Sequence, residues 1–87
     1  MNEFSEKYFV YVIKSKEGYH YTGLASDLDK RLAEHNTKSL SFWTKRGIDW
    51  KIIYKEVFSN YTQAIKREKW LKSGAGRDFL KENVNNY

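Results

Sequence analysis

The segment Tyr8–Lys14 restricts the possible folds of this chain more than any other. Its sequence, YFVYVIK, is apolar on both faces and rich in the aromatic and β-branched residues that favour strands. Such a pattern is typical of a strand in the centre of a sheet. Turn residues follow over Ser15–Gly18, where glycine can adopt positive φ, and Tyr19–Leu24 then returns as a second predicted strand. The sequence therefore begins with a predicted hairpin whose first strand is central.

The remaining pattern predicts three helices and a third strand. Ser26 and Asp29 form a capping box, and the turn Ser73-Gly74 is typical of a helix end. The expected elements are, in chain order, a helix from Ser26 to about Asn36, a loop over 37–49, a strand over Trp50–Phe58, a helix over Asn60–Lys72 capped by Asn60 and Gln63, and a short helix from about Gly76 to Val84.

Size and composition exclude several classes of protein. A chain of 87 residues is expected to form one domain, with a thin core to which fifteen aromatic residues contribute. Cysteine is absent, so disulfides and thiolate zinc sites are excluded. No apolar run approaches the roughly 20 residues that span a bilayer, and the polar, acidic start does not resemble a signal peptide. We expect a soluble cytoplasmic protein with no membrane contact.

Glu68 lies among the apolar positions of its predicted helix. The apolar residues that recur there at helical spacing are Tyr61, Ala64, Ile65 and Leu71. A carboxylate that faces a core without a partner loses its hydration, which costs several kcal/mol or forces protonation. Two interpretations stay open at this point: Glu68 pairs with a neighbouring Lys or Arg, or it faces a cleft and holds a cation.

Four further side chains could share a site with Glu68. Tyr11 and Tyr21 lie on the first two strands, while Arg31 and His35 are four residues apart and share one face of the first helix. A guanidinium can bind two phosphate oxygens, an imidazole exchanges protons near neutral pH, and a carboxylate with water ligands suits Mg²⁺.

Each of these residues also has a structural interpretation. A tyrosine in a strand commonly packs on a sheet face. Arg31 could pair with Asp27 or Glu34, and His35 could complement the dipole at the end of its helix.

The charge of the chain favours an anionic partner. The formal net charge is +5, and the sequence pI is about 9.4, which points to nucleic acid first. Within the predicted loop, Lys38, Lys45 and Arg46 flank Phe42 and Trp43. Basic groups among aromatic rings suit a phosphate backbone and unstacked bases. The alternative is that one of the two aromatic rings fills the small core beneath the loop.

Several segments between about residues 8 and 83 form a set that is typical of one family. They are FVY (9–11), YTG (21–23), GLASDLDKRLAEHN (23–36), WKIIYKE (50–56), and REK (67–69) followed by LKSG (71–74). Together they resemble the GIY-YIG nuclease superfamily, in particular its small stand-alone, excision-repair-nuclease-like type. Phe9 replaces the glycine of the first motif, and Thr22 replaces the middle residue of the second.

The resemblance implies an α/β (α+β) fold, in which a three-stranded antiparallel sheet is flanked by helices in the order β-β-α-β-α-α. It also implies an endonuclease that uses Mg²⁺ or Mn²⁺ to cleave phosphodiester bonds of nucleic acid, DNA in preference to RNA. In that mechanism Tyr11 is the general base with help from Tyr21, and Arg31 binds the phosphate. Glu68 holds the metal, and His35 assists proton transfer or positioning.

An alternative function remains open on the same fold. Homing and repair members of the family carry separate DNA-binding or partner domains, and this sequence shows none. The chain could therefore be a nucleic-acid-binding or adaptor module with little turnover, acting with a protein partner. The full set of five candidate residues favours the enzyme. Many relatives also have a supporting asparagine after the glutamate, and Asn83 lies near that position.

Overall fold

The computed structural model describes residues 7–37 and 46–87. Its elements are β1 (Tyr8–Lys14), β2 (His20–Ala25), α1 (Leu28–Asn36), β3 (Lys51–Phe58), α2 (Tyr61–Leu71) and α3 (Gly74–Asn83). The predicted order β-β-α-β-α-α is confirmed, and so is the α+β fold. No helix in the described ranges is long and apolar enough to cross a membrane.

The sheet is antiparallel with strand order β2-β1-β3, so β1 lies in the centre as its sequence predicts. Gly18 makes the hairpin turn with φ of +99°, a conformation that L side chains rarely adopt. The register places Tyr11 of β1 opposite Gly23 of β2 and opposite Lys55 of β3. The pairing of Tyr11 with a glycine decides the geometry of the candidate site below.

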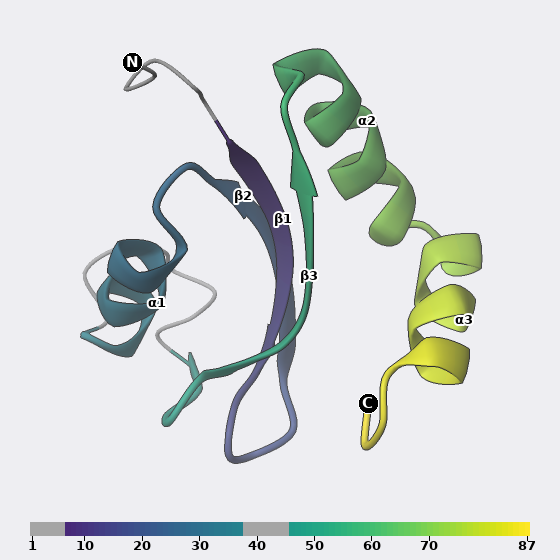
Figure 1. Cartoon of the computed structure of the whole chain (residues 1–87). Helices are drawn as coiled ribbons and strands as arrows, with labels where there is room; N and C mark the ends of the chain where they lie inside the picture. Colours follow the sequence, from purple (N-terminus) through teal and green to yellow (C-terminus); the bar gives the residue numbers. More distant parts are fainter. Residues whose placement is uncertain (1–6, 38–45) are drawn as a thin grey trace.

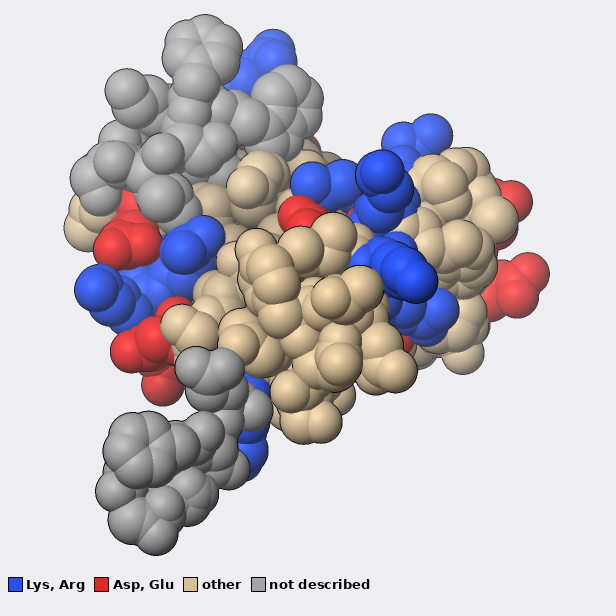
Figure 2. Space-filling model, turned by 90° about the horizontal axis from the view of Figure 1, so that it is seen from above, with Lys and Arg blue, Asp and Glu red and all other residues tan. Residues whose placement is uncertain are grey.

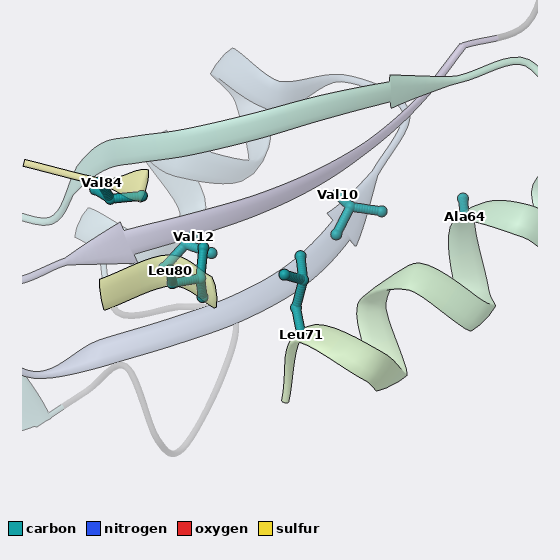
Figure 3. Close-up of a cluster of buried hydrophobic side chains, with 6 residues drawn as sticks. All are labelled: Val10, Val12, Ala64, Leu71, Leu80 and Val84. Carbon is teal, nitrogen blue, oxygen red and sulfur yellow. The ribbon is translucent and has the colours of Figure 1, made fainter. Parts of the chain in front are cut away.

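Helices cover both faces of the sheet, with α1 on one side and α2 and α3 on the other (Figure 1). Because successive side chains of a strand alternate between faces, β1 supplies both cores. Val10 and Val12 point toward α2 and α3 (Figure 3), where their partners are Ala64, Leu71, Leu80 and Val84. Tyr11 and Ile13 face the other way, and they pack with Ala25, Leu28 and Trp50.

An asparagine fastens the end of α1 to the start of β3. The side chain of Asn36 accepts a hydrogen bond from the backbone N–H of Trp50 at 2.7 Å and donates one to its carbonyl at 3.1 Å. The Trp50 ring is buried against the face that α1 covers. These contacts hold the helix that carries Arg31 and His35 against the tyrosines of the sheet.

Some predicted helix ends are wrong by one or two residues. The N-cap of α1 is Asp27 rather than Ser26, since its Oδ1 accepts a hydrogen bond from the backbone N–H of Lys30 at 3.0 Å. Ser73 does not end α2 but caps the start of α3, where its hydroxyl accepts from the N–H of Gly76. Consequently α3 begins at Gly74, two residues before its predicted start.

The apolar stripe predicted for α2 is only partly buried. Ala64 and Leu71 are fully buried, but Tyr61 and Ile65 are 54% and 38% exposed. The face that packs on the sheet is therefore defined by Ala64 and Leu71, and Glu68 lies between them with its side chain 21% exposed.

Candidate active site

Tyr11 lies at the centre of the candidate site, and the backbone of β2 makes room for its ring. Its side chain is fully buried, and it reaches across β2 over Gly23. A Cβ atom at Gly23 would lie 2.5 Å from the hydroxyl oxygen of Tyr11 and 2.9 Å from Cε2 of Tyr21. Only glycine therefore lets both rings lie over this strand. In the sequence, Gly23 belongs to a motif but has no predicted role. Its role follows from the strand register, which places it opposite Tyr11.

His35 of α1 contacts both tyrosines. Its Nε2 is 2.8 Å from the Tyr11 hydroxyl, and its ring centroid is 4.8 Å from that of Tyr21. The imidazole is fully buried. Burial and then the charge of Arg31 lower the pKa of His35, so the ring is neutral at neutral pH.

The same burial acts on the phenol in the opposite direction. Desolvation, followed by the proximity of Tyr21 and Glu68, raises the pKa of Tyr11 well above its ordinary value of 10.0, and Arg31 only partly opposes this. Tyr11 is thus protonated at neutral pH. When the imidazole carries its proton on Nδ1, the Tyr11 hydroxyl donates a hydrogen bond to Nε2.

Arg31 lies one turn before His35, and its charge lowers the pKa of the Tyr11 hydroxyl. Its Nη1 donates a long hydrogen bond to the Leu24 carbonyl at 3.4 Å. The guanidinium also forms an ion pair with Glu34 at 3.4 Å, with both side chains about one third exposed, as the structural interpretation predicted. A pair this exposed contributes about 0.2–1 kcal/mol, so an incoming phosphate can compete with Glu34 for the guanidinium.

Glu68 approaches from α2, on the opposite face of the sheet from α1. Its carboxylate pairs with Lys72 one turn later at 2.9 Å, which confirms one of the two interpretations of its position. Its charge nevertheless raises the pKa of Tyr11, so the carboxylate lies within electrostatic reach of the hydroxyl. The structure therefore brings Tyr11, Tyr21, Arg31 and His35 into contact or close approach, and the charge of Glu68 acts on Tyr11.

The donor atoms fit one type of metal site. Among the described residues, no group of three or more His, Asp or Glu side chains could hold a metal ion, which excludes a cage built from those ranges alone. Mg²⁺ commonly uses one or two carboxylates, with substrate phosphate and water completing its shell. Glu68 can serve as such a single ligand if a cation displaces the half-exposed Lys72.

Of the four residues predicted to bind nucleic acid, the structure describes Arg46. Lys38, Trp43 and Lys45 lie outside the described residues. Arg46 is exposed, with its guanidinium 5.8 Å from the centre of the Tyr19 ring beside the hairpin. The side-chain amide of Asn83 donates a hydrogen bond to the Phe79 carbonyl of its own helix at 2.8 Å. This hydrogen bond does not involve Tyr11 or the residues around it.

The fold and this group of side chains define a small nuclease-like domain. The chain belongs to the GIY-YIG family, because the family model described as the GIY-YIG catalytic domain matches residues 7–82. That family consists typically of nucleases.

The relatives share most of their length with this chain. A UPF0213 protein of Staphylococcus saprophyticus is 34% identical over 76 residues, which cover 87% of this chain and 93% of the relative. A UPF0213 protein of Staphylococcus epidermidis is 33% identical with the same coverage. The solution NMR structure of a UPF0213 protein from Bacillus halodurans has a TM-score of 0.57 at 21% identity, over 93% of this chain and 89% of that one, and shows the same fold.

A methyl group at Gly23 is expected to disrupt the site. In Gly23→Ala the new Cβ overlaps the Tyr11 and Tyr21 rings, so both rings must move or the strand must shift. Overpacking of this kind costs about 1–3 kcal/mol, which a thermal melt will show, and the Tyr11–His35 hydrogen bond should be lost. Gly74→Ala is the matched control, because a Cβ there meets nothing within 4 Å; equal destabilisation of both variants would contradict the close approach.

Burial of His35 predicts a pH dependence of stability. Its pKa is lowered from 6.5 in the folded state, so the unfolded chain binds the proton more tightly. The contribution of the buried, neutral His35 to stability is fully present above pH 6.5. It is lost as the pH falls from there through the pKa of His35 in the folded state. Melting temperatures of wild type and His35→Gln across this range should converge toward acid. Parallel curves would show that His35 titrates normally.

Proposed function

We propose that this protein is a metal-dependent endonuclease that cleaves phosphodiester bonds of nucleic acid, DNA in preference to RNA. The supporting observation is the buried Tyr11–His35 hydrogen bond beside Arg31, within reach of the Glu68 charge, in a chain of the GIY-YIG family. Basic side chains also gather on the α2 and α3 half of the face seen in Figure 2, as an anionic partner requires.

Tyr11 and His35 would activate the attacking water together. The high pKa of Tyr11 opposes a free phenolate. The proton of the Tyr11 hydroxyl therefore passes to Nε2 of neutral His35 while Tyr11 takes a proton from the water. The hydroxide attacks phosphorus, and the bond from phosphorus to the leaving oxygen breaks. The leaving oxygen is protonated from solvent, to which the imidazolium returns its proton through Tyr11. The Tyr21 ring, 4.8 Å from the imidazole, helps to hold His35 in place.

Arg31 and Glu68 would supply the charges that the reaction needs. The Arg31 fork can leave Glu34 and bind two phosphate oxygens, where it stabilises the developing negative charge. Glu68 would hold Mg²⁺ or Mn²⁺, which when bound neutralises charge on the phosphoryl oxygens. Lys72 then loses its partner and is free to contact the nucleic acid.

The second candidate function is a binding or adaptor module with little turnover. The Glu68–Lys72 ion pair favours it, because a carboxylate already paired with a lysine binds a cation less readily. On this alternative, Arg31 and the lysines would bind the phosphate backbone, and Tyr11 would serve only the core.

A cleavage assay distinguishes the two functions. Wild type and Glu68→Ala are incubated with a panel of structured DNA and RNA molecules, with Mg²⁺ or with chelator. The proposal requires Mg²⁺-dependent products from wild type and none from Glu68→Ala. Binding without products by wild type in the presence of Mg²⁺ would support the module instead.

A further inference from the structure

A cavity of about 780 Å³ opens beside the candidate site, between β2, the end of α2, and α3. Two of the residues that line the cavity also contact residues of the candidate site. Tyr21 packs on His35, and Lys72 pairs with Glu68. The cavity therefore adjoins the proposed reaction centre, and its volume lies within the range of about 300–1,000 Å³ that is common for small-molecule sites.

The chemistry of the lining has two parts. Lys72, Arg77 and Lys81 supply positive charge, and none of the described residues that line the cavity is acidic. Leu71, Val84 and Tyr87 supply apolar surface. A phosphate attached to a flat heterocycle matches such a lining. The basic side chains can bind the phosphate, and the heterocycle can pack on the apolar surface.

The wall formed by Tyr87 is held in place. Its ring stacks on His20 of β2, with centroids 4.0 Å apart and an angle of 25° between the planes. The backbone just before it is tied down as well, since Lys14 Nζ donates to the Asn86 carbonyl at 2.6 Å. The cavity is thus formed before any ligand arrives, which lowers the entropic cost of binding.

We propose that this cavity binds one nucleotide of the substrate strand, next to the phosphodiester that is cleaved. Its phosphate contacts Arg77 and Lys81, with Lys72 joining once Glu68 releases it, and its base lies against Val84 and Tyr87. A base in this cavity has left the duplex stack. This inference rests on the proposed function. It specifies the substrate as a nucleic-acid strand with an unpaired nucleotide beside the cleavage position.

Binding without metal tests the cavity apart from the chemistry. Fluorescence anisotropy with a labelled oligothymidylate compares wild type with the double variant Arg77→Ala/Lys81→Ala. The matched control is Lys66→Ala/Lys69→Ala, which removes two exposed α2 lysines outside the cavity. The cavity variant should bind about tenfold more weakly, and its salt slope should fall by about 1.4, because each contact to a single strand contributes about 0.7. Equal losses in the two double variants would overturn the proposal.

A comparison of strands with and without bases tests the contact between the base and Tyr87. Wild type should bind oligothymidylate more tightly than an abasic strand of equal length, and Tyr87→Ala should remove that difference. Equal binding of both strands by wild type would reject the base-binding wall.

Cleavage assays separate failure of the subsite from failure of the nuclease. If wild type cleaves and the cavity variant cleaves equally well, the subsite is rejected and the nuclease stands. If oligothymidylate binds through Arg77 and Lys81 but no substrate is cleaved, the binding site stands, and both the nuclease and the placement of the site beside a cleaved bond are rejected.

Discussion

Tyr11→Phe is expected to reduce cleavage by about 10²–10⁴-fold, the typical contribution of a positioned general base. The phenylalanine ring still fits over Gly23, so the core keeps its shape. The hydroxyl is lost, and with it both the proposed contact to the attacking water and the hydrogen bond to His35 that would carry the proton. Affinity for nucleic acid should stay near that of wild type, since the lysines and arginines are unchanged.

The same substitution should also lower stability, because it removes the buried hydrogen bond between the Tyr11 hydroxyl and Nε2 of His35. The loss of one such hydrogen bond costs about 0.5–1.5 kcal/mol. Single-turnover cleavage and thermal melts measure the two effects separately. Tyr54→Phe is the matched control, since the Tyr54 hydroxyl also donates to a side chain, that of Glu56, in the cluster around Arg67. Comparable loss of cleavage in both variants would show that Tyr11 acts through the fold and not through its hydroxyl.

The sequence predicted the sheet well because one strand carries the decisive information. YFVYVIK is apolar on both faces, and only a central strand with layers on both sides can bury it. The helix ends were less predictable. Ser26 and Asp27 can both cap α1, and the choice depends on which oxygen reaches the Lys30 N–H in the folded chain. Ser73 is equally ambiguous between the end of α2 and the start of α3.

The candidate site residues could be named from the sequence, but the contacts between them could not. Spacing of four placed Lys72 beside Glu68, so that ion pair was among the alternatives from the start. The Tyr11–His35 hydrogen bond joins residues 24 positions apart, and it depends on how α1 packs against the sheet. The same packing turns His35 inward, where burial lowers its pKa.

Glu68→Gln is expected to abolish metal-dependent cleavage while nucleic-acid binding persists. The amide keeps the shape of the side chain but lacks the charge that would hold a cation. In metal-free buffer the stability should change little, because the lost partner is a half-exposed lysine and such helical pairs contribute about 0.3–0.5 kcal/mol. Glu82→Gln, which removes an exposed carboxylate from α3, is the control.

Thermal melts with increasing Mg²⁺ test the assignment of Glu68 as metal ligand most directly. A cation that binds only the folded protein raises its melting temperature by mass action. The temperature should therefore rise with Mg²⁺ in wild type and in Glu82→Gln, and it should stay unchanged in Glu68→Gln. An equal rise in all three proteins would show that Glu68 is not the ligand, and it would contradict the proposed metal-dependent mechanism.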